Sequence, residues 1–149
     1  MNFTTKTFEE LSNSELYAIL KLRSEVFVVE QNCVYQDIDN LDQKSLHVFG
    51  IHKNEIVAYT RILPPKLYYK EAAIGRVVTS KIVRMDGYGK EIMRFSIDLI
   101  KSKFNSDIRI MAQCYLNKFY TDLGFKIEGP EFLEDGIPHV EMVLDKKKV

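Results

Sequence analysis

The sequence predicts one mixed α/β (α+β) domain over residues 1–149, with helices on both faces of a central sheet. Helical and strand-like stretches follow one another in mixed order rather than in strict alternation. The length of 149 residues is that of one domain, which buries about two-thirds of the surface that its unfolded chain exposes. Because no repeat or interdomain linker interrupts the sequence, we expect one continuous core.

The N-terminal region begins with a short strand, expected at residues 3–8, and continues into a helix. Ser12 and Glu15 have the spacing of a capping box, which predicts that the helix starts there. The β-branched pair Val28 and Val29 is expected to weaken its far end. The apolar side of the helix consists of Leu16, Ile19, Leu20, Val26 and Phe27.

The loop over residues 31–42 carries three aspartates, Asp37, Asp39 and Asp42. An EF-hand calcium loop requires a glycine after the third ligand and a distant glutamate, and neither is in place. We therefore expect solvated loop carboxylates here, which could attract a cationic acceptor.

Lys53 and Asn54 form a connection of hairpin length between two apolar runs, which predicts a β-hairpin. Towards the C-terminus, a strand, a short helix and a closing pair of strands are expected. The ranges predicted for these elements are 46–52 and 55–63 for the hairpin, 108–113 for the strand, 116–123 for the helix, and 125–128 and 139–144 for the closing pair.

The central region combines a buried strand, expected at residues 74–78, with a long helix at 87–104 whose polar and apolar residues recur with the helical period. Arg84, Gly87 and Gly89 lie at the joint. The first N–H groups of a helix have no partners within it, so such a joint attracts anions such as a diphosphate. The alternative is an ordinary turn whose glycines serve only a positive φ.

Two common phosphate-binding motifs do not fit this joint. A Walker loop needs Ser or Thr after Gly-Lys, but Glu91 follows Lys90. The dinucleotide fingerprint needs a third glycine where this chain has Ile92. We therefore do not expect a P-loop nucleotidase, and the dinucleotide-binding fingerprint is not present.

The pattern Arg84-x-x-Gly87-x-Gly89 resembles the acetyl-coenzyme A pyrophosphate signature of the GNAT superfamily of N-acetyltransferases. The tract 112–125, AQCYLNKFYTDLGF, resembles the second segment of that superfamily, with Tyr120 four residues before Gly124. With the tracts VFVVEQNCVYQDID, TRILPP and GIPHVEM, the whole chain looks like the ElaA-like branch. This resemblance implies a mostly antiparallel sheet whose middle strands splay apart.

The resemblance also implies acetyl-coenzyme A as co-substrate, with its diphosphate at the turn and its pantetheine arm along the splayed strand. The backbone N–H near Val78 is expected to polarise the thioester carbonyl. Gln113 stands where many relatives carry an asparagine, and Asp86 places a carboxylate in the anion-binding turn. No metal is expected. The residues expected at the coenzyme are Val77, Val78, Arg84, Met85, Gly87, Tyr88, Gly89, Lys90 and Gln113.

Two catalytic side chains follow from the resemblance and from proton chemistry. Tyr120 is the expected general acid, because a phenol can return a proton to the leaving thiolate. His139 is a candidate base, since neutral imidazole accepts protons near pH 7. The alternatives are a core tyrosine and a histidine that only packs the last strand. Glu30 and Glu141 are weaker candidates for the base.

The composition restricts the partners. Lys plus Arg and Asp plus Glu number 21 each, which gives no electrostatic case for a nucleic-acid binder. No apolar run suits a membrane helix or an export signal, so a cytoplasmic location without membrane contact is expected. Cys33 and Cys114 are expected to be reduced thiols. The assembly is left open, with a homodimer as one form.

The leading hypothesis is an acetyl-coenzyme A-dependent N-acetyltransferase that acts on an amine of a small molecule or peptide. The alternative is a non-catalytic module that binds or senses acyl-coenzyme A, which would share Arg84 and the glycines but would not need Tyr120. A purely structural domain is a third reading.

Overall fold

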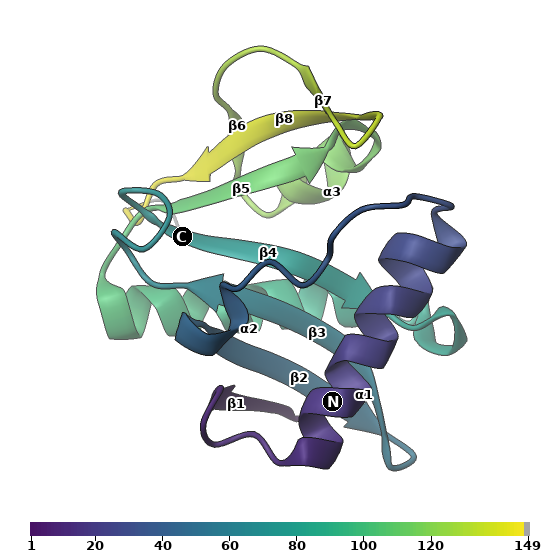
Figure 1. Cartoon of the computed structure of the whole chain (residues 1–149). Helices are drawn as coiled ribbons and strands as arrows, with labels where there is room; N and C mark the ends of the chain where they lie inside the picture. Colours follow the sequence, from purple (N-terminus) through teal and green to yellow (C-terminus); the bar gives the residue numbers. More distant parts are fainter. Residues whose placement is uncertain (148–149) are drawn as a thin grey trace.

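The computed structural model describes residues 1–147, so the last two residues of the domain predicted over 1–149 lie outside the described part. Eight strands form one sheet in the order β1-β2-β3-β4-β5-β8-β6, and β7 also pairs with β8 (Figure 1). The strands are β1 (Phe3–Thr7), β2 (Leu46–His52), β3 (Glu55–Leu63), β4 (Ala72–Thr79), β5 (Ile108–Gln113), β6 (Lys126–Ile127), β7 (Phe132–Glu134) and β8 (Ile137–Leu144). The helices are α1 (Asn13–Arg23), α2 (Tyr88–Phe104) and α3 (Asn117–Asp122), with shorter helical segments η1 (Ser24–Glu30), η2 (Asp42–Lys44), η3 (Lys81–Val83) and η4 (Cys114–Leu116).

The predicted capping box forms at the start of α1. The Glu15 backbone N–H donates to Ser12 Oγ at 3.0 Å, and the Ser12 N–H donates to Glu15 Oε1 at 2.8 Å. The α-helix ends at Arg23, before the valine pair that was expected to weaken it. The chain continues from there as the π-helix η1. Such π-helical turns are frequent at functional sites.

The predicted hairpin is confirmed with its bounds. Lys53 and Asn54 both adopt left-handed backbone, with φ of 50° and 66°, as a tight two-residue connection between twisted strands requires. In the C-terminal part, the predicted helix begins one residue later, at Asn117, and the predicted strand 125–128 shortens to β6. Strand β7, which has only three residues, was not predicted from the sequence.

The sheet opens between β4 and β5, as the resemblance implied. These two parallel strands pair only at Ala72 with Ile108 and at Ala73 with Arg109, and then diverge. Beyond Ala73, the edge of β4 that faces β5 has no strand partner. All other strand pairs are antiparallel, so the sheet consists of two antiparallel parts joined at one end of β4.

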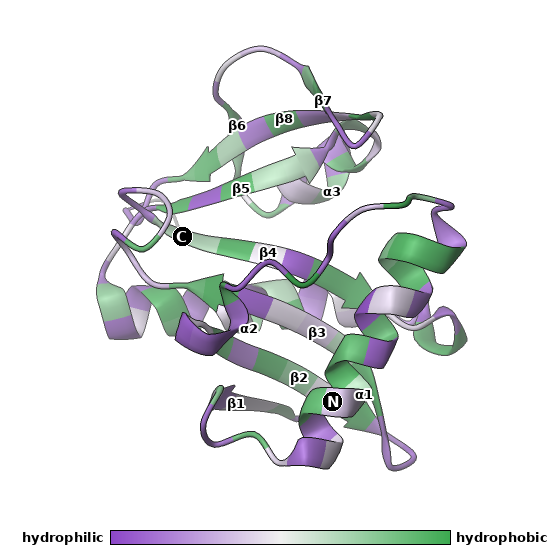
Figure 2. Cartoon of the chain, in the orientation of Figure 1, coloured by the Kyte–Doolittle hydropathy of each residue, from purple (hydrophilic) through white to green (hydrophobic). Residues whose placement is uncertain are grey.

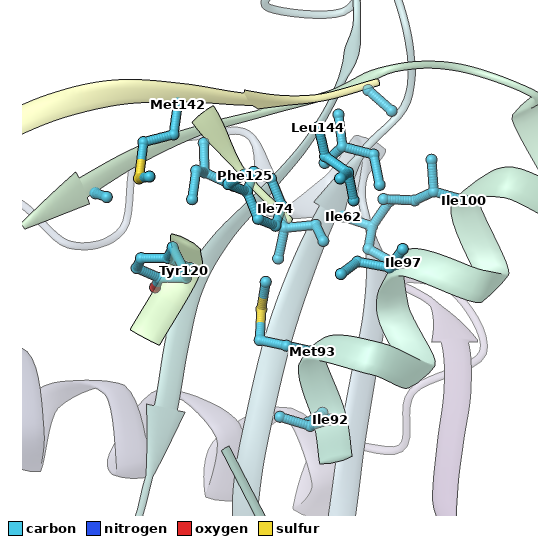
Figure 3. Close-up of a cluster of buried hydrophobic side chains, with 14 of the residues drawn as sticks. Ile62, Ile74, Ile92, Met93, Ile97, Ile100, Tyr120, Phe125, Met142 and Leu144 are labelled. Atoms are coloured by element: carbon cyan, nitrogen blue, oxygen red, sulfur yellow. The ribbon is translucent and has the colours of Figure 1, made fainter. Parts of the chain in front are cut away.

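Helices cover both faces of the sheet. The larger core cluster combines α2 and α3 with one face, and Figure 3 shows Met93 and Ile97 of α2 directed toward Ile74 of β4. The second cluster joins α1 to the other face of β2–β4, where Ile19 is fully buried. Figure 2 shows hydrophobic and hydrophilic residues alternating around α1, as expected for a helix with one buried side.

The prediction of solvated aspartates in the loop 31–42 is wrong. Asp37 and Asp42 are buried, with 8% and 5% of their surface exposed, and Arg23 of α1 is fully buried between them. Arg23 Nε lies 2.9 Å from Asp37 Oδ2, and Arg23 Nη1 lies 2.8 Å from Asp42 Oδ1. Arg61 of β3 lies 2.9 Å from the same Asp42 oxygen. Buried guanidinium groups require such carboxylates, because a lone charge is not stable in a protein interior.

The same loop is also tied to β4. Arg76 Nε lies 2.8 Å from Asp37 Oδ1, its Nη2 donates to the Asp37 carbonyl at 2.9 Å, and Asp39 Oδ2 accepts from the same nitrogen at 3.2 Å. Asp39 also accepts two hydrogen bonds from Arg61. We call the six side chains of this group the loop network: Arg23, Asp37, Asp39, Asp42, Arg61 and Arg76. It fixes the loop 31–42 against the α1 side of the sheet (Figure 1).

Candidate active site

The turn between β4 and α2 has the geometry expected of an anion-binding joint. Met85 and Gly87 adopt left-handed backbone, with φ of 77° and 83°. Gly87 is the N-cap of α2 and offers no side-chain cap, so the N–H groups of Tyr88, Gly89 and Lys90 have no hydrogen-bond partner within residues 1–147. These donors and the helix dipole favour an anion at this point.

A cavity of about 340 Å³ lies at this helix start. It brings together six of the predicted coenzyme-binding residues. The lining consists of Thr79, Val83, Arg84, Met85, Gly87, Tyr88, Gly89, Lys90 and Phe119. Asp86, which carries the unfavourable charge, is exposed and is not part of the lining, so it does not oppose an anion from inside the cavity.

Arg84 lines the cavity but is not a free cation. Its Nη1 and Nη2 both donate to the carboxylate of Glu30 at the end of η1, with Nη2 at 2.9 Å from Oε1. Nη2 also donates to the Thr79 carbonyl at 3.1 Å. The hydrogen bonds from Arg84 hold the pKa of Glu30 below its ordinary value. Glu30 is therefore an ion-pair partner rather than a base in the free chain.

The segment of β4 that was expected to bind pantetheine lies beside the opening of the sheet. Arg76, just before it, adopts a left-handed φ of 52°, and the pairing with β3 shifts register here. Val78 packs into the α1 cluster, whereas Val77 packs against the α2 cluster. Neither valine lines the 340 Å³ cavity. The backbone on the β5 side of this segment is left without a strand partner.

Tyr120 is buried in the α2 cluster, with 6% of its surface exposed. Its ring makes edge contacts with Phe119 and Phe125, at centroid distances of 5.0 and 6.0 Å. Burial raises the pKa of its hydroxyl, which makes no hydrogen bond to any residue that the structure describes. The Tyr120 oxygen is not among the fully buried side-chain atoms that lack a hydrogen-bond partner, so solvent or a ligand can reach it.

His139 and Gln113 are paired across β8 and β5, so both side chains lie on one face of the sheet. Because Ala112 belongs to the α2 cluster, its neighbour Gln113 points to the opposite face, which is that of α1. Gln31 Nε2 donates a hydrogen bond to Gln113 Oε1 at 3.3 Å. His139 Nδ1 donates to the Ile137 carbonyl at 2.7 Å, which leaves Nε2 as the acceptor of a neutral ring. Tyr120 and His139 therefore lie on opposite faces of the sheet.

Comparisons with known proteins agree with this geometry. A family model described as an acetyltransferase (GNAT) domain matches residues 7–146. Protein ElaA of Escherichia coli is 40% identical over 136 residues, covering 89% of each chain. The chain belongs to the GNAT acetyltransferase family. Within the family it groups with ElaA, whose crystal structure matches 97% of this chain and 100% of its own with a TM-score of 0.91.

Two further GNAT-fold structures are similar over most of their length. An acyl-CoA N-acyltransferase from Pseudomonas aeruginosa is 35% identical, with a TM-score of 0.91, and the match covers 97% of this chain and 99% of that one. An aminoglycoside 6'-N-acetyltransferase, solved in complex with coenzyme A, has a TM-score of 0.73 at 13% identity, with 96% and 97% covered. This last likeness shows the fold alone. Membership of the family places the chain among acyltransferases.

Several residues at the candidate site were not identified from the sequence. Thr79, Val83 and Phe119 line the cavity. Phe119 directly precedes Tyr120 on the same short helix, so its place near the candidate site could have been predicted from the sequence. Glu30 was considered only as a base, and its pairing with Arg84 was missed.

The remaining candidates have other partners. Glu141 lies 3.5 Å from Arg109, which also pairs with Glu71 and Glu128. Cys33 and Cys114 form no disulfide. Residues 1–147 hold no group of three His, Cys, Asp or Glu side chains that could bind a metal ion. None of the helices described combines the length and the hydrophobicity needed to cross a membrane.

Proposed function

We propose that this chain is an acetyl-coenzyme A-dependent N-acetyltransferase, in which an amine of a small molecule or peptide attacks the thioester directly. The observation that carries the proposal is the cavity at the start of α2, where Arg84 and three unpaired backbone N–H groups converge. A diphosphate suits this set of donors. A Cβ at Gly89 would lie 3.6 Å from Phe119, an ordinary contact, so packing does not require glycine there; this supports the close approach of a ligand to the backbone.

The open edge of β4 supports the placement of the acyl arm. Pantetheine amides can pair with the free backbone groups at Val77 and Val78 as an added strand would. A thioester carbonyl beside Val78 would receive a backbone N–H, which stabilises the oxyanion that forms on attack. No side chain needs to form a covalent intermediate.

Tyr120 and His139 would then act from opposite faces of the opening. The Tyr120 phenol is protonated at neutral pH, and burial raises its pKa further, so it can serve the leaving thiolate as a proton donor but cannot act as the base. His139 offers Nε2 on the α1 face, where the attacking amine would lose its proton. The amine nitrogen forms the amide bond, the carbon–sulfur bond breaks, and the thiolate takes the proton from Tyr120. The proton that His139 has accepted is released to solvent, and the Tyr120 phenolate regains a proton from solvent before the next turnover.

Free thiol release tests the activity. Purified protein with acetyl-coenzyme A and a panel of small and peptide amines should release thiol with at least one amine and not without it. Binding of coenzyme A without release for any amine would favour the alternative of a non-catalytic binding or sensing module. A cytoplasmic location and a single domain over 1–149 are further parts of the proposal, and the assembly is left open, with a homodimer as one form.

The variant Tyr120→Phe tests the acid. It removes only the hydroxyl, so turnover should fall by about a hundredfold to ten-thousandfold, the usual contribution of general acid catalysis. The affinity for coenzyme A, measured by calorimetry, should stay within about twofold. Thr121→Val, which removes a hydroxyl from an exposed position of the same helix away from the cavity lining, serves as the control. Unchanged turnover in Tyr120→Phe would remove the phenol from the mechanism.

A further inference from the structure

Glu30 faces the candidate coenzyme site from a distant part of the sequence. It ends the π-helical segment η1, 54 residues before Arg84, and both of its carboxylate oxygens accept hydrogen bonds from that arginine. The two side chains are partly exposed, at 34% for Arg84 and 27% for Glu30. Water therefore reaches the pair, and separating its members does not leave a buried charge.

The contacts of Arg84 occupy the positions that a phosphate group would use. A guanidinium presents five N–H groups, and pairs of them on adjacent nitrogens bind an oxyanion in a fork. Glu30 fills the fork of Nη1 and Nη2, and the Thr79 carbonyl takes a further N–H of Nη2. Only Nε and one N–H of Nη1 remain, and these do not form a fork.

Ion pairs also reduce the positive charge of the cavity. Glu30 neutralises Arg84, and the other cationic lining residue, Lys90, lies 3.9 Å from Asp122. The negative charge of the Glu30 carboxylate also opposes an anion that approaches Arg84. In the free chain, attraction for a diphosphate therefore comes mainly from the backbone N–H groups at the start of α2.

We infer that Glu30 competes with the coenzyme diphosphate for Arg84 and thereby sets the affinity for the acyl donor. The carboxylate holds the guanidinium at the cavity in the free chain. When the donor binds, its phosphate oxygens replace Glu30 in the Nη1 and Nη2 fork, and the released carboxylate returns to solvent. This inference rests on the proposed function, because it assumes that coenzyme A occupies the cavity at the start of α2.

Calorimetric titration with coenzyme A tests the competition. Glu30→Gln keeps the size of the side chain but removes its charge, so Kd should fall by about tenfold, which corresponds to about 1.4 kcal/mol. Glu30→Asp keeps the charge with a shorter reach and should give an intermediate Kd. In an Arg84→Gln background, Glu30→Gln should change Kd by less than about twofold, because the contested group is gone.

Glu25→Gln is the matched control. It makes the same change of charge on the same π-helical segment, but Glu25 is 56% exposed and lies 3.9 Å from Lys21, away from the cavity. Its Kd should stay within about twofold of the wild-type value. Thermal unfolding of each variant checks that the fold is kept.

The outcomes separate the inference from the proposed function. If wild-type protein binds coenzyme A and Glu30→Gln binds no tighter, Glu30 positions Arg84 and does not compete, and the inference is overturned. If Glu25→Gln tightens binding as much as Glu30→Gln, the effect is one of net charge and the inference also fails. If neither wild type nor Glu30→Gln binds coenzyme A, the proposed function fails as well.

Discussion

The loop network and the Arg84–Glu30 pair use the same chemistry in different surroundings. In the loop network, Arg23 and Arg61 are almost fully buried, and Asp42 bridges them. The Arg84–Glu30 pair lies at the rim of a cavity, and about a third of the arginine side chain is exposed. Breaking the first leaves buried charges without partners, whereas breaking the second only hydrates two groups. Burial therefore distinguishes an arginine that holds the fold from one that is free to exchange partners.

Asp42→Ala should have the largest effect on stability. It leaves two buried guanidinium groups with one carboxylate fewer, and breaking a buried ion pair costs about 3–5 kcal/mol. The free energy of unfolding in urea measures this. The control Asp86→Ala removes an exposed carboxylate and should change stability by less than about 0.5 kcal/mol. A loss below about 1 kcal/mol for Asp42→Ala would remove the proposed difference between the two regions.

Arg84→Gln should change the affinity for coenzyme A much more than the stability of the fold. Hydrogen bonds to charged groups contribute about 1.5–3 kcal/mol, so coenzyme A affinity should fall by about ten- to hundredfold while stability changes by less than about 1 kcal/mol. Calorimetry and urea unfolding measure the two quantities. Arg94→Gln makes the same change of charge on an exposed position of α2 and should leave both nearly unchanged. Equal affinity losses in the two variants would mean that only net charge matters.

Acid should weaken the loop network gradually. Burial alone would raise the pKa values of Asp39 and Asp42, but the hydrogen bonds and charges of the arginines outweigh it and hold both below the ordinary value of 3.8. The network therefore contributes stability above the unfolded-state pKa, and this contribution is lost as the pH falls through the folded-state values. Urea midpoints between pH 7 and pH 3 should fall, and Asp42→Asn should show a shallower fall. Parallel curves would contradict this assignment.

Local signals were sufficient to predict much of the fold. The capping box of Ser12 and Glu15 and the turn at Lys53 and Asn54 depend on neighbouring residues only, and both are found as expected. The loop network depends on pairs such as Arg61 and Asp39, which are 22 residues apart. Charged loop residues are usually solvated, so the aspartates were misread. The arginine inside the otherwise apolar stretch around Arg61 was a signal that a buried carboxylate was required.

In the candidate site, too, the local features were predicted from the sequence and a contact between distant residues was not. The turn from Arg84 to Lys90 is continuous in sequence, and all of its residues except Asp86 line one cavity. Glu30 reaches that cavity from another element, and no local pattern indicates its partner. The roles of Tyr120 and His139 stay predictions, because they depend on where the thioester lies in the opening of the sheet.

The opening between β4 and β5 has a consequence for the behaviour of the protein in solution. An unpaired strand edge is normally a template for association with other chains and for fibril growth. Here the free edge of β4 lies inside the sheet rather than at its border, and the segment fixed by Asp37 and Arg76 runs beside it. A second chain cannot approach such an edge as it would an outer strand. The protein can therefore keep unpaired backbone groups on β4 without the aggregation risk that an outer edge would carry.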